Sequence, residues 1–230
     1  VPVKKEAEKR LLTFWCGTEK IYEFEISCVD TEETYPEDFC AVLPVKKWKG
    51  QKIRIEGDVC ESLLSAVREK ESAVRENSGY IHFVPETGWI NDPNGLIYSE
   101  GKYHLYFQHN LVDVNWGNMS WGHAESTDLL HWVQKEDVMF PDENGTMFSG
   151  CAILNERGLL GLPKDTPVFF YTVAGSASEW SKGKKFVQRI AYSTDQGETL
   201  TKIEENVLEH IEADNRDPKV YWHEEKQLYY

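Results

Sequence analysis

The sequence predicts an all-β fold, in which a small N-terminal sandwich precedes four-stranded blades of a β-propeller. Short segments of alternating or β-branched apolar residues recur along the 230 residues, with Gly, Pro, Asn and Asp between them. A five-residue fragment also recurs, at 124–128 (AESTD) and 191–195 (AYSTD). Its spacing exceeds the ~40–50 residues of a typical blade, and we assign the excess to loops at 158–167 and 175–185.

The composition is that of a globular protein whose partners are not polyanions. Hydrophobic residues make up 40% of the chain and aromatic residues 13%, which is enough to bury a core. The formal net charge of −14 repels phosphate backbones and argues against nucleic acid as a partner. No apolar run approaches the ~20 residues of a membrane span.

The cysteines and the first residues leave the compartment open. Five cysteines are an odd number, and none of them forms a CxxC pair. This argues against a zinc site and a disulfide framework, while leaving room for one bridge. The first residues, VPVKK, do not resemble a signal peptide and indicate a trimmed or processed start.

Residues 1–58 are expected to form the small sandwich. The predicted strands, which turn residues separate, lie at 11–15, 21–26, 39–45 and 51–57. The acidic loops between them are interpreted as solvated surface. Residues 59–78 follow as a helical linker, because their apolar positions recur at helical spacing (Val59, Leu63, Ala66, Val67).

Residues 79–230 are expected to form the first two and a half blades of the propeller. The predicted strands of the first two blades lie at 96–98, 102–108, 121–126, 132–135, 149–154, 168–173, 189–193 and 199–203. A third blade begins at 217–222 and 227–230. An incomplete propeller leaves strand edges unpaired, so self-association through these edges is expected.

One stretch, 88–95 (GWINDPNG), combines turn chemistry with groups that can bind a sugar. Pro93 suits the second position of a turn, and the two residues after it tolerate positive φ. We therefore expect a tight turn here, with Asp92 extended at a strand end. A carboxylate, an amide and an indole then lie together, and an indole face can pack on a sugar ring. The alternative is a turn without a function.

Four more motifs follow in order: 106–110 (YFQHN), 116–124 (WGNMSWGHA), 148–150 (FSG) and 215–218 (NRDP). With the first stretch, they resemble glycoside hydrolase family 32, which contains invertases, inulinases and levanases. The resemblance covers about residues 80–230. Residues 1–58 resemble the small sandwich that precedes the catalytic domain in some bacterial members.

This resemblance implies a five-bladed propeller that hydrolyses β-fructofuranosides with retention, at the mouth of its central channel. Asp92 would be the nucleophile, and Asp217 would bind fructosyl hydroxyls and stabilise the transition state. The residues that would line the fructose pocket are Asn91, Gln108, Trp116, Phe148, Ser149 and Arg216. No cofactor and no metal are implied. The expected ligand is a fructose-containing oligo- or polysaccharide, and the expected location is secreted or periplasmic.

Physical reasoning supports these roles and also supplies an alternative for each. A retaining mechanism needs two carboxyl groups ~5–5.5 Å apart, and inner-strand ends of successive blades point at one axial pocket. A guanidinium at Arg216 should keep Asp217 ionised. Alternatively, Gln108 and Ser149 are ordinary strand-end polar groups, the two aromatic residues are core, and Arg216 forms a structural ion pair. The histidines alternate along strands without metal-ligand spacing (His104, His109, His123, His131).

The sequence departs from the family pattern in three places. Ile90 and Leu111 replace a usual Met and Pro. More seriously, the family supplies its general acid/base from a Glu-Cys pair downstream of the Arg-Asp-Pro motif, and no cysteine follows Cys151. We therefore expect these 230 residues alone to be an inactive fragment of an enzyme. The alternative is a non-catalytic fructan-binding or assembly module.

Overall fold

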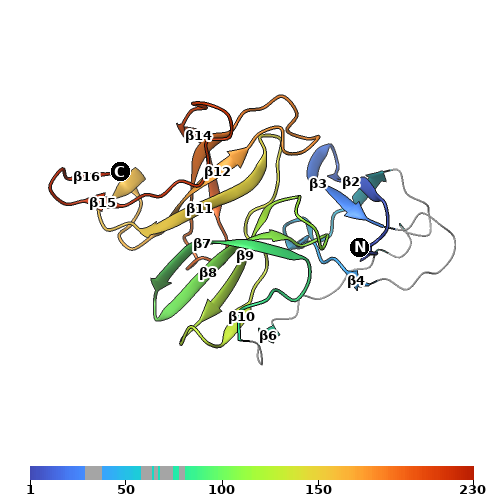
Figure 1. Cartoon of the computed structure of the whole chain (residues 1–230), viewed down its shortest axis with the longest axis horizontal. Helices are drawn as coiled ribbons and strands as arrows, with labels where there is room; N and C mark the ends of the chain where they lie inside the picture. Colours follow the sequence, from blue (N-terminus) through green and yellow to red (C-terminus); the bar gives the residue numbers. More distant parts are fainter. Residues whose placement is uncertain (29–37, 58–63, 65–66, 68–74, 78–80) are drawn as a thin grey trace.

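The computed structural model describes the chain except residues 29–37, 58–63, 65–66, 68–74 and 78–80. The described part is nearly all β, which confirms the predicted fold class. Figure 1 shows the sheet of β7–β10 in the centre and the sheet of β11–β14 beside it. The N-terminal strands lie on the right of the same view. The short hairpin of β15 and β16 lies farthest from the N-terminal strands.

The N-terminal unit consists of two small antiparallel sheets. One sheet has the order β3-β2-β5, and β1 pairs with β4 in the other. Their bounds are β1 Pro2–Val3, β2 Lys9–Cys16, β3 Glu19–Ser27, β4 Phe39–Cys40 and β5 Ile53–Gly57, with a 3₁₀ turn at Lys46–Trp48. The strand predicted over 39–45 ends at Cys40, and Pro44 lacks the N–H that a continuing ladder would need.

The core of this unit extends into the propeller. Its buried apolar cluster includes Phe24 and Ile26 from β3, together with Leu111 and Val112, which follow strand β8. Nearby, the Ser27 hydroxyl donates a 2.7 Å hydrogen bond to the buried carboxylate of Asp113. A shared core and a buried hydrogen bond fix the N-terminal unit against the first blade. The predicted division into domains at 58 and 79 stays a prediction.

The first blade has five strands instead of the expected four. Its order is β6-β10-β9-β8-β7, all antiparallel. The bounds are β6 Arg75–Asn77, β7 Trp89–Ser99, β8 Lys102–Asn110, β9 Ser120–Ser126 and β10 Trp132–Gln134. The helix predicted over 59–78 is wrong at its end, because 75–77 form β6 on the outer edge of β10. Edge pairing outweighs local helix propensity there; most of the remaining predicted helix lies outside the described residues.

The second blade has the expected four strands, in the order β11-β12-β13-β14. Its bounds are β11 Thr146–Leu154, β12 Pro167–Ala174, β13 Val187–Tyr192 and β14 Thr201–Leu208, with a 3₁₀ turn at Leu159–Gly161. Strands β15 Trp222–His223 and β16 Leu228–Tyr229 begin a further hairpin. Beyond β14, apolar side chains such as that of Ile211 are exposed, and self-association stays a prediction.

The recurring fragment forms the same turn in both blades. The Ser126 hydroxyl donates to the Asp128 carboxylate (3.1 Å) at the end of β9. The Ser193 hydroxyl donates to the Asp195 carboxylate (2.8 Å) directly after β13. Strand β9 is third when its sheet is counted from β7, and β13 is third when its sheet is counted from β11. The recurring fragment therefore lies at an equivalent position in each blade.

The two blades pack through aromatic and sulfur-containing side chains. Trp121 is fully buried in a cluster with Tyr106, Met147 and Phe169. The Trp121 indole N–H also donates to the backbone carbonyl of Phe148 (3.0 Å), which crosses from β9 to β11. This core fixes the first strand of the second blade relative to the first blade.

Candidate active site

The predicted turn at residues 92–95 is not a turn, because these residues lie inside strand β7. Ile90 pairs with His109 and Pro93 pairs with Phe107, so Asn91 and Asp92 together oppose one residue, Gln108. Pro93 cannot donate a ladder hydrogen bond, and bulges are where sheets accept proline. The bulge takes Asn91 and Asp92 out of the ladder, and their exposed side chains are available to a ligand.

Strand β11 carries a matching bulge. Met147 pairs with Val173 and Gly150 pairs with Tyr171, so two candidate residues, Phe148 and Ser149, share a single opposing residue. That opposing residue is Thr172 of β12. Bulges are common beside active sites, where they redirect side chains. Both sequence motifs therefore lie on bulges in the first strand of a blade.

A hydrogen bond joins the two bulges. The Ser149 hydroxyl donates to Oδ2 of Asp92 at 2.8 Å. Next to it, the backbone N–H of Gly150 donates to Oδ1 of Asn94 at 3.3 Å. Gly150 lies so close to β12 that a Cβ would come within 2.0 Å of the Phe170 carbonyl oxygen. The close approach explains the glycine of the Phe-Ser-Gly motif.

The other predicted residues of the first blade lie around this junction. The Trp89 indole donates to Oδ1 of Asn91 at 3.1 Å. Gln108 is buried and donates to the carbonyl of Met147 at 2.9 Å, so it ties the two blades together. Trp116 is 54% exposed, and its ring meets the buried ring of Phe148 edge-on at 6.0 Å. Trp116 therefore offers a largely open aromatic surface next to the bulge.

The backbone of Asp217 is anchored to the strand that pairs with the β11 bulge. Its backbone N–H donates to the Thr172 hydroxyl at 3.1 Å. Its φ of 61° is left-handed, a strained value that often marks functional positions. The Arg216 Nε lies 3.5 Å from the Asp217 carboxylate, and both side chains are about half exposed. The Asp92 carboxylate thus contacts Ser149 in the β11 bulge, and the Asp217 backbone contacts Thr172, the β12 residue that opposes this bulge.

Sequence reasoning missed Thr172 and Gln188. The Thr172 hydroxyl donates to Oε1 of Gln188 (2.7 Å), and Nε2 of Gln188 donates to the Asn215 carbonyl (2.9 Å). Both side chains are buried and hold the segment that leads to Asp217. The sequence did carry an indication of their role, because a polar residue inside a largely buried strand needs a hydrogen-bond partner.

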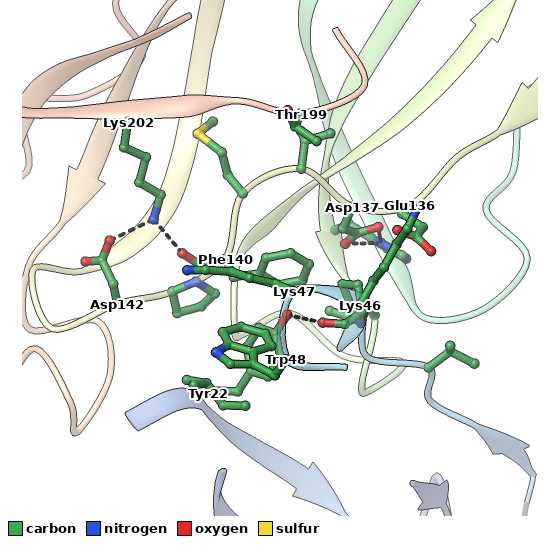
Figure 2. Close-up of a pocket in the computed structure, with 18 of the residues that line it drawn as sticks. Tyr22, Lys46, Lys47, Trp48, Glu136, Asp137, Phe140, Asp142, Thr199 and Lys202 are labelled. Carbon is green, nitrogen blue, oxygen red and sulfur yellow. Dashed lines mark hydrogen bonds and ion pairs between the residues drawn. The ribbon is translucent and has the colours of Figure 1, made fainter. Parts of the chain in front are cut away.

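A buried histidine holds the segment that enters β7. His109 donates from Nε2 to the Thr87 carbonyl (2.9 Å) and from Nδ1 to the Asp137 carboxylate (2.9 Å), which is labelled in Figure 2. Burial alone lowers the pKa of His109, but the charge and hydrogen bond of Asp137 outweigh burial and raise it. Both ring nitrogens of His109 are therefore hydrogen-bonded, and the contact to Thr87 holds the segment two residues before Trp89.

Replacing His109 by Gln should destabilise the chain most at low pH. A folded-state pKa above the ordinary ~6.5 adds stability that is complete below ~6.5 and is lost as the pH rises through the folded value. We expect a loss of about 2–3 kcal/mol below about pH 6, and a smaller loss at about pH 9, from chemical denaturation at both values. The His82→Gln variant, at an exposed histidine, serves as control. An equal loss at both pH values would contradict a charged His109.

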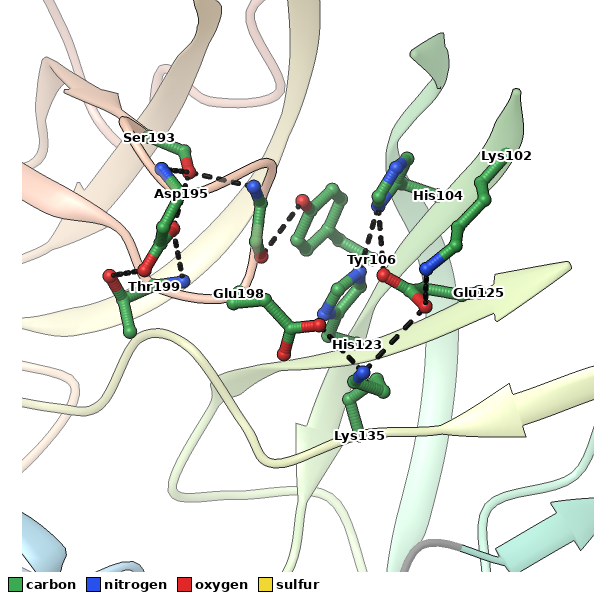
Figure 3. A network of polar contacts seen from close by, with 11 residues as sticks. Lys102, His104, Tyr106, His123, Glu125, Lys135, Ser193, Asp195, Glu198 and Thr199 are labelled. Carbon is green, nitrogen blue, oxygen red and sulfur yellow. Dashed lines mark hydrogen bonds and ion pairs between the residues drawn. The ribbon is translucent and has the colours of Figure 1, made fainter. Parts of the chain in front are cut away.

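A second polar cluster lies in the first blade, away from the bulges (Figure 3). His104, His123 and Glu125 bring three ligand atoms within 4.8 Å of one another, which sequence spacing did not reveal. Among the residues that the structure describes, these three could hold a metal ion. However, Lys102 (2.9 Å) and Lys135 (3.6 Å) already contact the Glu125 carboxylate. Burial and the neighbouring His104 lower the pKa of His123 to about 3, so His123 is a neutral imidazole at neutral pH. The charge of Glu125 is instead compensated by the two lysines.

Comparison with known proteins identifies the family. The model of the glycosyl hydrolases family 32 N-terminal domain matches residues 82–230. The chain belongs to glycosyl hydrolase family 32. The levanase of Bacillus subtilis (strain 168) is 41% identical over 151 residues, which are 64% of this chain and 21% of that protein. The extracellular exo-inulinase of Aspergillus awamori is 38% identical over 172 residues, covering 65% of this chain and 32% of that protein.

Solved structures of family 32 agree with the fold. The crystal structure of the Aspergillus awamori exo-inulinase superposes with a TM-score of 0.57 at 36% identity, over 64% of this chain and 33% of the other. A family 32 structure from Bifidobacterium adolescentis covers 96% of this chain and 40% of its own, with a TM-score of 0.50 at 22% identity. The fold likeness thus includes the N-terminal unit. The chain spans about a fifth to a third of the length of the first two relatives.

Proposed function

We propose that these residues form the N-terminal part of a retaining β-fructofuranosidase, with Asp92 as its nucleophile. The observation that carries the proposal is the position of Asp92, on a bulge of β7 with its carboxylate hydrogen-bonded by Ser149 of the next blade. Family membership supports it, since relatives are named levanase, exo-inulinase and invertase. Each of these names refers to cleavage of a fructose-containing saccharide.

The geometry gives Asp92 the freedom that a nucleophile needs. The Ser149 hydroxyl holds Oδ2, which leaves Oδ1 to attack the anomeric carbon of a fructosyl unit. The bond from that carbon to the leaving oxygen breaks as the new ester bond forms, and a general acid protonates the leaving oxygen. Water then cleaves the ester and restores the carboxylate. The Asp217 carboxylate would accept hydrogen bonds from fructosyl hydroxyls, and the Arg216 guanidinium would donate to them. The Trp116 ring would pack on a face of the sugar.

The general acid is not assigned within these residues. The family resemblance places it in a Glu-Cys pair, and no such pair follows Asp217 in residues 218–230. General acid–base catalysis is worth ~10²–10⁴ in rate, so the 230-residue chain should turn over sucrose, inulin and levan negligibly. The role of Asp92 can therefore be tested without the general acid, by using a substrate whose leaving group departs without being protonated.

β-D-Fructofuranosyl fluoride is that substrate, because fluoride departs unprotonated. We expect the chain to gain the mass of one fructosyl unit, and peptide mapping to find it on Asp92. The ester should persist, since no general base activates water to remove it. Labelling at another residue would overturn the assignment. Failure to label, together with binding of fructo-oligosaccharides, would instead favour the non-catalytic binding module.

The hydrogen bond from Ser149 gives a graded test of the same site. In the Ser149→Ala variant, the carboxylate of Asp92 loses its fixed orientation, and we expect labelling by the fluoride to slow about tenfold. Ser149→Thr keeps the hydroxyl and should retain most of the rate. Equal rates for the Ala and wild-type proteins, measured by intact mass over time, would show that this contact does not position the nucleophile.

We also propose an extracytoplasmic location. The Aspergillus awamori exo-inulinase is named as extracellular, and polymeric fructans do not cross membranes unaided. Within the described residues, none of the helical segments has the length and apolar character to span a bilayer.

A further inference from the structure

A large cleft lies where the N-terminal unit meets the propeller, and neither Asp92 nor Asp217 lines it. Its volume is about 1400 Å³. Sites for drug-sized molecules usually measure ~300–1,000 Å³, so this cleft has room for an elongated ligand. Figure 2 shows residues of β3, the 3₁₀ turn at 46–48, the segment after β10 and the start of β14 around the same space.

Aromatic side chains give the cleft a rigid floor. Tyr22 of β3 meets the ring of Trp48 edge-on at 5.7 Å and the ring of Phe140 edge-on at 5.1 Å. The Tyr22 hydroxyl donates to the Pro44 carbonyl at 2.7 Å, and burial raises the pKa of this phenol above its ordinary range. These contacts fix Trp48, which is half-buried and lines the cleft.

The rims are built from polar contacts between distant segments. Lys20 of β3 lies 4.9 Å above the ring of Trp180, which belongs to the loop between β12 and β13. On another side, the Lys202 ammonium donates to the Phe140 carbonyl (2.9 Å) and to the Asp142 carboxylate (2.7 Å). The cleft is therefore held open by packed and bonded residues of both units.

The excess of negative charge around the cleft repels anionic ligands. Among the described residues, five lysines and nine acidic residues line it. Phosphorylated ligands and nucleic acids are repelled by such an excess. Aromatic faces combined with hydrogen-bonding groups of both signs suit a neutral, polyhydroxylated ligand.

We propose that this cleft is a second saccharide-binding site, which holds a fructose-containing oligosaccharide apart from the bulge site. The identity of the sugar rests on the proposed function, whereas the existence of the site rests on the cleft. Trp48 and Trp180, one from each unit, are the aromatic residues that contact the sugar, beside the lysines that lie over their rings (Lys47 at 5.2 Å and Lys20 at 4.9 Å). Binding here keeps a polymeric chain at the protein between encounters with Asp92 and raises its local concentration.

The test is calorimetry of the 230-residue chain with nystose, a neutral fructo-oligosaccharide. We expect two sites. Trp180→Ala should weaken one of them about tenfold or more and leave labelling of Asp92 by fructosyl fluoride unchanged. Trp180→Phe keeps an aromatic surface and should restore most of the affinity. Trp48→Ala should weaken the same site. If the Trp48 variant does not fold, the Trp180 variants still decide the test, because Trp180 lies on a loop.

The outcomes separate this proposal from the proposed function. Asp217→Ala should remove the other site and leave the Trp180-dependent one. If Asp92 is labelled but the tryptophan variants bind nystose like the wild type, the cleft proposal is wrong and the function stands. If nystose binding depends on Trp180 but no label forms on Asp92, the cleft proposal stands and the nucleophile assignment fails.

Discussion

Asp92→Asn should abolish the covalent fructosyl adduct that fructofuranosyl fluoride forms on the wild-type chain. An amide has no charge to attack the anomeric carbon, and loss of a nucleophile commonly costs a factor of ~10³ or more. The replacement is nearly isosteric, and the amide can still accept the hydrogen bond from Ser149. The fold should therefore be unchanged, and nystose binding should be largely retained.

The matched control is Asp165→Asn, which changes the same atoms at an exposed loop residue. Asp165 has a φ of 63°, a conformation that asparagine adopts readily, so this variant should fold and label like the wild type. Intact mass spectrometry with time measures both variants in one format. Labelling of Asp92→Asn at the wild-type rate would remove Asp92 from the mechanism.

Trp121→Ala should cause the largest loss of stability among single core changes at the blade junction. Trp121 is fully buried between the blades, and truncating a buried Trp costs about 3–5 kcal/mol through lost contacts and the cavity left behind. The variant also leaves the Phe148 carbonyl without its indole donor. We expect a clearly lower midpoint in urea denaturation and slower labelling of Asp92, because Phe148 and Ser149 share the bulge.

Trp121→Phe separates these two effects. It keeps much of the buried volume and removes only the indole N–H, so it should cost less than the Ala variant. A further control, Trp89→Ala, truncates a Trp that is 36% exposed and should lose far less stability. If Trp121→Ala unfolds at the wild-type urea concentration, this residue does not hold the blades together.

The sequence predicted the family of the chain, but not the backbone that presents the candidate residues. The order of five motifs identified the family, and the recurring Ser-Thr-Asp fragment located the third strand of each blade. The bulge at Asn91 and Asp92 could not be predicted, because it depends on which residue of β8 faces which residue of β7. Local chemistry at Pro93 is equally compatible with a turn, and only the pairing across the sheet decides between them.

Other failures have the same origin in long-range contacts. The Glu- and Arg-rich segment before residue 79 has helical propensity, yet 75–77 pair with β10, whose edge offers free backbone groups. Thr172 has no motif around it. It becomes important only because it opposes the bulge of β11 and accepts a hydrogen bond from the Asp217 N–H. The metal-like cluster of His104 and Glu125 also depends on register across β8 and β9.

The central claim is that Asp92 and Asp217 serve one sugar site, built on the bulges of β7 and β11. A crystal structure of the Asp92→Asn variant with nystose tests it most directly. We expect a fructosyl unit between residues 92 and 217, with its anomeric carbon facing the substituted side chain on β7 and its hydroxyls bonded to Asp217 and Arg216. A fructosyl unit bound only elsewhere, with the side chains at 92 and 217 facing separate regions, would contradict the claim.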